Sequence, residues 1–185
     1  MMSSRKLAVA VFVAFAGAPA VFAAEGGTEA TVGLGKATLG DAVSNDQKEM
    51  LAPGPGKRFL WVAAKLSGPP MVVDLTKVAL VSGSETFTLI GVDSAHDGEA
   101  KEFSMIAQAL SNSGKVGDPL PETRSTGFVS FAFSPKTKTA TLKLLQPPET
   151  VCLLFSVPST LKAGQINGLG AKPLPLPALA TTARH

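Results

Sequence analysis

Apolar and polar residues alternate in short runs along most of the chain, and this period-two pattern predicts β-strands. The clearest run is residues 58–66, in which Leu60 and Val62 lie on one face while Phe59 and Trp61 lie on the other. A strand that is apolar on both faces is normally covered on both faces. We therefore expect a central strand here, with a layer of protein over each side.

Other strand-like segments are separated by clusters of Gly, Pro and Ser, which favour turns. The remaining expected strands cover residues 29–39, 71–73, 75–81, 86–92, 128–133, 139–145 and 150–157. A turn at Ser82-Gly83-Ser84 joins two of them into a hairpin. Residues 101–110 suit either a strand or a short helix, and residues 41–51 are expected to hold one helical turn capped by Ser44 or Asn45.

This number of strands, without a long amphipathic helix, is typical of an all-β sandwich. No alternation of strands and helices and no glycine fingerprint is present, which excludes a nucleotide-binding α/β fold. The length of the chain fits one such domain. We expect the β-sandwich domain to occupy residues 24–165 and a Pro-rich tail to occupy residues 166–185.

The first 23 residues have the pattern of a secretory signal peptide. Two basic residues precede the unbroken apolar run Leu7–Phe15, Pro19 interrupts any helix, and Val21 and Ala23 are small residues at the −3 and −1 positions. A retained membrane anchor is the competing interpretation, but no stop-transfer charges follow the run. We expect cleavage after Ala23, no membrane span after cleavage, and a periplasmic or secreted protein.

Charge and cysteine content exclude several classes of function. The chain has 17 basic and 14 acidic residues, but loss of Arg5 and Lys6 with the signal peptide leaves 15 basic residues. These are scattered, so we expect no nucleic-acid partner. Cys152 is the only cysteine and lies in an apolar strand, where we expect a buried, unreactive thiol. A blue-copper centre needs two histidines beside the thiolate; His96 and His185 are the only histidines, and we expect no cofactor.

The loop between residues 93 and 99 holds the densest set of candidate functional side chains. They are Asp93, Ser94, His96, Asp97 and Glu99. A hydrolase triad needs serine, histidine and carboxylate to converge in space beside an oxyanion hole, which neighbours in one loop rarely achieve. The order of the acidic residues does not match a calcium loop either. A solvated loop is the favoured interpretation, and a hydrolase or metal-binding site is the alternative.

Phe59 and Trp61 are the candidate partner-binding residues. They form either a second buried layer under loops or the tail, or an exposed aromatic stripe of the kind that concentrates binding energy at interfaces. The tail segment 172–179, KPLPLPAL, is stiff and extended because prolines stand at alternate positions. We expect it to pack along its own domain, with the Phe59/Trp61 face as one candidate surface. A free partner-binding tail is the alternative.

Two short stretches, PGKRFLWV at residues 55–62 and CLLFSVP at residues 152–158, carry motifs of a known kind. They resemble the entry into the second strand and the near-terminal strand of a telokin-like, immunoglobulin-like family of secreted bacterial proteins of mostly unknown function. Residues 80–91 are similar to its middle hairpin, whereas Ser67-Gly68 replaces its usual asparagine. The resemblance implies an immunoglobulin-like β-sandwich of about seven to eight strands with no shared catalytic residues. We therefore expect a non-catalytic binding or assembly module whose partner is an extracytoplasmic protein or envelope component.

Overall fold

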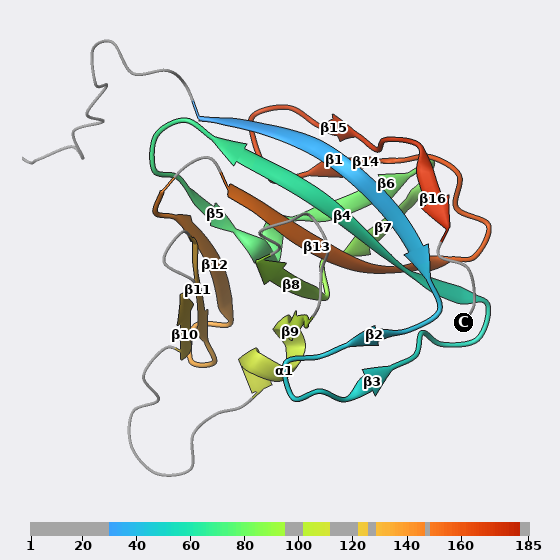
Figure 1. The fold of residues 1–185 in the computed structure, drawn as a ribbon, viewed down its shortest axis with the longest axis horizontal. Helices are drawn as coiled ribbons and strands as arrows, with labels where there is room; N and C mark the ends of the chain where they lie inside the picture. Colours follow the sequence, from blue (N-terminus) through green and yellow to red (C-terminus); the bar gives the residue numbers. More distant parts are fainter. Residues whose placement is uncertain (1–29, 95–101, 112–121, 126–128, 147–148, 182–185) are drawn as a thin grey trace, which may run out of the picture.

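The computed structural model describes residues 30–94, 102–111, 122–125, 129–146 and 149–181 (Figure 1). These residues are mostly in strands, and helix is confined to the 3₁₀ turn η1 (Leu75–Lys77) and the short helix α1 (Ile106–Ser111). The all-β class expected from the alternating pattern is confirmed. The described residues form more strands than the seven to eight expected. Many of the additional strands contain only two or three residues, which is too short for an alternating pattern to be recognised in the sequence.

A six-stranded sheet, called the large sheet, is the main layer of the fold. Its strands, in spatial order, are β16 (Leu179–Thr181), β1 (Thr31–Gly40), β4 (Lys57–Ser67), β13 (Glu149–Pro158), β8 (Gly91–Ser94) and β9 (Ser104–Met105). Strand β4 pairs antiparallel with β1 on one side and β13 on the other. The central strand predicted over residues 58–66 is therefore confirmed.

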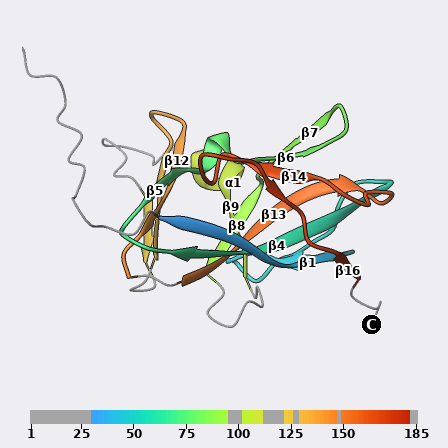
Figure 2. The ribbon, with the colours of Figure 1, turned by 90° about the horizontal axis from the view of Figure 1, so that it is seen from above.

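Two four-stranded sheets contribute to the same hydrophobic core as the large sheet. The first has the order β10 (Glu122–Ser125), β11 (Val129–Ser134), β12 (Thr139–Leu144) and β5 (Val72–Asp74). The second has the order β15 (Leu174–Pro175), β14 (Gln165–Asn167), β6 (Ala79–Ser82) and β7 (Glu85–Thr88). Strand β5 leads through η1 into β6, so one stretch of chain joins both sheets. Figures 1 and 2 show β6 and β14 lying across one face of the large sheet.

The inner core lies between these sheets and is built from alternate residues of each strand. Leu60 and Val62 of β4, Leu153 and Phe155 of β13, and Phe133 of β11 are completely buried within it. Period-two alternation directs these side chains to one face, and removing them from water supplies the main driving force for folding.

A smaller outer cluster covers the opposite face of the large sheet. Its buried members are Val43, Phe59, Ala63, Phe103, Cys152 and Leu154. The covering residues come from the hairpin β2 (Val43–Ser44)–β3 (Met50–Leu51) and from the segment that leads into β9. The expectation that the central strand is covered on both faces is confirmed, and so is the burial of Cys152.

The helical turn expected within residues 41–51 is absent, and a β-hairpin stands in its place. Buried Asn45 organises this hairpin, because its Oδ1 accepts the backbone N–H groups of Gln47 at 3.0 Å and Glu49 at 2.8 Å. Lys48 completes the turn in the left-handed region, with φ 63°. Asn side chains favour such turns as readily as they cap helices, so the residue was correct and the element wrong.

The described part of the tail packs on its own domain, as expected from its stiffness. Strand β15 pairs with β14, and β16 lies parallel to β1. Leu174, Leu176 and Leu179 pack against the inner core, whereas Phe59 and Trp61 belong to the outer cluster. The tail leucines therefore do not cover Phe59 and Trp61. The ambiguous residues 101–110 contain both predicted elements, since β9 is followed directly by α1.

Candidate functional site

Asp93 and Ser94 lie at the end of β8 and face opposite sides of the large sheet. Asp93 stands opposite Cys152 of the outer cluster, whereas Ser94 stands opposite Val151 of the inner core. The Asp93 carboxylate (Oδ2) accepts the backbone N–H of Glu102 at 3.3 Å. Adjacent strand residues point in opposite directions, so these two side chains do not form a common site.

The other three loop candidates, His96, Asp97 and Glu99, lie outside the described residues. Within the described residues, no group of three or more histidine, cysteine, aspartate or glutamate side chains has a geometry that could hold a metal ion. The hydrolase and metal-binding interpretations of this loop remain untested predictions.

The two aromatic candidates on β4 differ in burial. Phe59 is 5% exposed and belongs to the outer cluster, so it serves as a core residue. Trp61 is half-buried and packs against the same cluster beside Leu51, Ile90 and Met105. Of this pair, only Trp61 offers part of its side chain to the surface.

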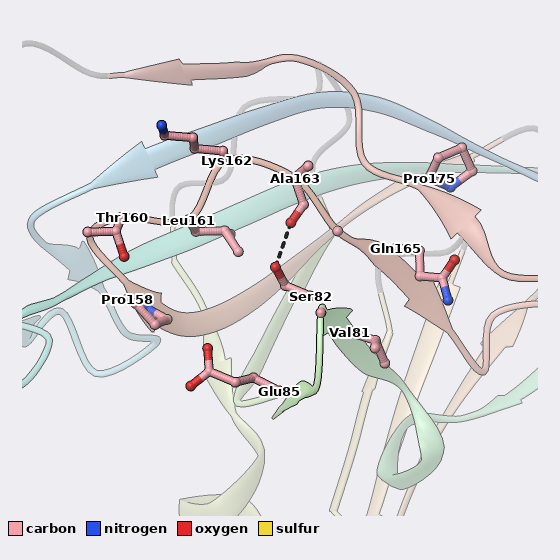
Figure 3. Close-up of a pocket in the computed structure, with 12 residues that line it drawn as sticks. Val81, Ser82, Glu85, Pro158, Thr160, Leu161, Lys162, Ala163, Gln165 and Pro175 are labelled. Atoms are coloured by element: carbon pink, nitrogen blue, oxygen red, sulfur yellow. Dashed lines mark hydrogen bonds between the residues drawn. The ribbon is translucent and has the colours of Figure 1, made fainter.

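An open hollow lies at the end of the molecule where the β6–β7 hairpin meets the connection from β13 to β14 (Figure 3). Its volume is about 640 Å³. The lining comes from the hairpin, the connection and β15, and consists of Val81, Ser82, Gly83, Glu85, Pro158, Thr160, Leu161, Lys162, Ala163, Gly164, Gln165 and Pro175. The sequence pattern predicted the hairpin but gave no sign of this hollow, because its two walls lie about 80 positions apart in the chain.

The walls of the hollow are joined by the pairing of β14 with β6, by a side-chain hydrogen bond and by a close approach of the backbone at Gly164. The Ser82 hydroxyl donates to the Ala163 carbonyl oxygen at 2.8 Å. Gly164 lies so close to β6 that an added Cβ would stand 2.8 Å from the carbonyl oxygen of Val81. The rim carries opposite charges, Lys162 on the connection and Glu85 on the hairpin, and both side chains are exposed (Figure 3).

Strand β7 forms one edge of its four-stranded sheet, next to this hollow. The N–H of Leu89 donates to the Val78 carbonyl oxygen of the facing segment at 3.3 Å. Because backbone groups alternate in direction along an antiparallel strand, Phe87 also bonds toward β6, while Thr86 and Thr88 turn their N–H and C=O groups outward. Both threonines are exposed. The site therefore combines an open hollow with an adjacent strand edge, a geometry suited to binding another chain.

Among the helices that the structure describes, none has the length and apolar character needed to cross a membrane. Compared with known proteins, the chain matches no family model, no curated protein and no solved structure. The resemblance to a telokin-like, immunoglobulin-like family therefore stays a prediction from short motifs.

Proposed function

We propose that the mature chain is an extracytoplasmic, non-catalytic binding or assembly module with an immunoglobulin-like β-sandwich fold. The observation that carries this proposal is the β6–β7 hairpin, which presents an outward-facing strand edge next to an open hollow. Sheet edges bind partners by adding a strand, and neighbouring depressions give specificity through side-chain contacts. Functions of such folds are carried by sites of this kind rather than by the fold itself.

The arrangement of the sheets supports the immunoglobulin-like part of the proposal. The large sheet is antiparallel apart from its edge pair β1–β16, and it shares one hydrophobic core with two smaller sheets. Two layers around a core, with binding surfaces at the ends of the strands, are the architecture of this class. The signal-peptide pattern of residues 1–23 supports a periplasmic or secreted location.

Lys162 and Glu85 supply charge selectivity at the rim of the hollow. Both side chains are exposed, so they steer a charged partner more than they tighten its binding. A partner segment that carries a negative group near Lys162 and a positive group near Glu85 would be favoured. The apolar residues between them, Leu161 and Pro158, would contact apolar side chains of the partner segment.

Co-purification of the tagged protein from its native envelope tests the proposal. We expect a partner to be recovered with the wild type and with Lys172→Glu, which changes an exposed lysine outside the hollow. Recovery should fall with Lys162→Glu, because the substitution reverses the charge at the rim. Equal recovery with both variants would show that the hollow is not the binding site.

An activity screen tests the non-catalytic part of the proposal. The wild type and His96→Ala are compared on a broad panel of ester and peptide substrates. Turnover by the wild type that disappears in His96→Ala would overturn the proposal in favour of a hydrolase. We expect no turnover that depends on His96.

A further inference from the structure

The outer edge of β7 lacks three of the features that protect strand edges from pairing, although the strand is short and carries Glu85. Proteins protect edges with proline, lysine or a bulge. At the other end of the same sheet, β15 lies in the alternating prolines Pro173, Pro175 and Pro177, which have no backbone N–H to donate. Strand β7 has the sequence Glu85-Thr86-Phe87-Thr88, without proline or lysine, and it pairs with β6 without a register shift. Threonine and phenylalanine also favour strands.

The tip of the β6–β7 hairpin projects away from the large sheet (Figure 2), while the middle of β7 packs on the inner core through Phe87. Thr86, Thr88 and Glu85 are exposed, and Phe87 is half-buried against the inner core. A strand that pairs with this edge would meet the N–H and C=O groups of Thr86 and Thr88, while the groups of Phe87 stay bonded to β6.

The edge of β7 is complementary to itself in one antiparallel register. If Phe87 lies on a twofold axis, Thr86 of one copy stands opposite Thr88 of the other, and each pair exchanges two backbone hydrogen bonds. All four outward N–H groups then find an acceptor. Shifting the pairing by two residues in either direction leaves only one threonine pair bonded.

Side chains agree with the same register. The two Phe87 rings stand directly opposite each other in a non-hydrogen-bonded pair, where cross-strand side chains approach most closely and aromatic pairs are favourable. Glu85 stands opposite Leu89 of the second copy, so the two glutamates do not face each other. Like charges directly opposite would destabilise the pair.

From this complementarity we propose that the protein forms a twofold dimer through β7, joining two four-stranded sheets into one continuous sheet. The occupant of the edge is a second copy of this chain. This inference rests on the proposed function, because it names the partner for the assembly role of the hairpin. A four-residue strand buries little surface, so the dimer is weak and depends on protein concentration.

Sedimentation of the purified mature protein from micromolar to millimolar concentration tests the dimer. We expect the wild type and Thr86→Ser to shift from monomer to dimer as concentration rises. Thr86→Pro removes an N–H that faces away from β6, and therefore two of the four intermolecular hydrogen bonds. We expect it to raise the dissociation constant by about tenfold or more.

A second pair of variants keeps the test decisive if Thr86→Pro fails to fold. Thr86→Lys combined with Thr88→Lys places like charges opposite each other across the dimer and should leave it monomeric, whereas the matched double serine variant should dimerise. A wild type that stays monomeric throughout, or a dimer that survives both the proline and the lysine variants, would overturn the inference. Recovery of an envelope partner by a monomeric protein would leave the proposed function standing without the dimer.

Discussion

Removal of residues 171–185 from the Pro-rich tail should lower the stability of the domain by about 3 kcal/mol. The perturbation is truncation after Gly170, which deletes β15 and β16. Leu174, Leu176 and Leu179 are half-buried against the inner core. Full burial of a leucine contributes about 1.5–3 kcal/mol, so each of the three contributes about 1 kcal/mol.

The tail also contributes backbone pairing, at three positions between β16 and β1 and at two between β15 and β14. Proline lowers the entropic cost of ordering this segment because its φ is already fixed. The figure of about 3 kcal/mol counts only the burial of the three leucines.

The assay is thermal and urea unfolding of the mature protein with and without residues 171–185. For a domain of this size, 3 kcal/mol corresponds to a fall in Tm of about 6–12 °C. Lys172→Ala is the matched control, because Lys172 is an exposed residue of the same segment and its loss should leave the Tm unchanged within about 1 °C. An unchanged Tm after truncation would refute the docking of the tail and leave it available to a partner.

Four further outcomes are expected. Gly168→Ala should destabilise by about 2 kcal/mol or more in urea unfolding, since φ is +85° and a Cβ would overlap a backbone carbonyl oxygen, whereas Gly170→Ala, with open space around it, should not. The pKa of Asp74 is lowered below 3.8, chiefly by a hydrogen bond from the Thr76 hydroxyl. The ionised Asp74 should therefore stabilise the fold above pH 3.8, and this stabilisation should be lost as the pH falls through the lowered pKa. Urea unfolding at several pH values should show that the stability difference between wild type and Asp74→Ala shrinks in acid. A thiol reagent should label Cys152 only at denaturant concentrations that unfold the protein, because its side chain is completely buried. Mass spectrometry of the exported protein should place the mature N-terminus at Ala24.

Much of the large sheet could be predicted from the sequence, because the alternation of side chains along a strand indicates which residues face the core. Strand β4 alternates without interruption, and its two apolar faces predicted the inner core and the outer cluster alike. The hairpin was also predicted, from the turn residues Ser82-Gly83-Ser84. In the structure Gly83 has a positive φ of 59°, which glycine adopts readily. At Asn45 the same reasoning named the right capping residue and the wrong element, because a side chain that accepts nearby N–H groups can organise a hairpin as well as a helix.

Long-range placement could not be predicted from the sequence. The hollow depends on Ser82 meeting Ala163, a contact between segments that no local pattern connects. The tail was expected to dock, but the alternation of leucine with proline did not say which surface its leucines would meet. An extended strand puts Leu174 and Leu176 on one face, and that face completes the inner core rather than covering Phe59.

The free edge of β7 is the part of the candidate site that sequence reasoning is least able to find. Alternation identifies the face of a strand that is buried, but an edge is defined by backbone N–H and C=O groups, which every residue except proline carries alike. Proline is therefore the residue whose presence in the sequence most directly indicates an edge strand, and Pro173 and Pro175 keep β15 at an edge. The absence of proline from residues 85–88 is not informative in the same way, because it permits either an edge or an interior position. Only the topology places β7 at the edge, and the outward groups of Thr86 and Thr88 then give that edge its capacity to pair.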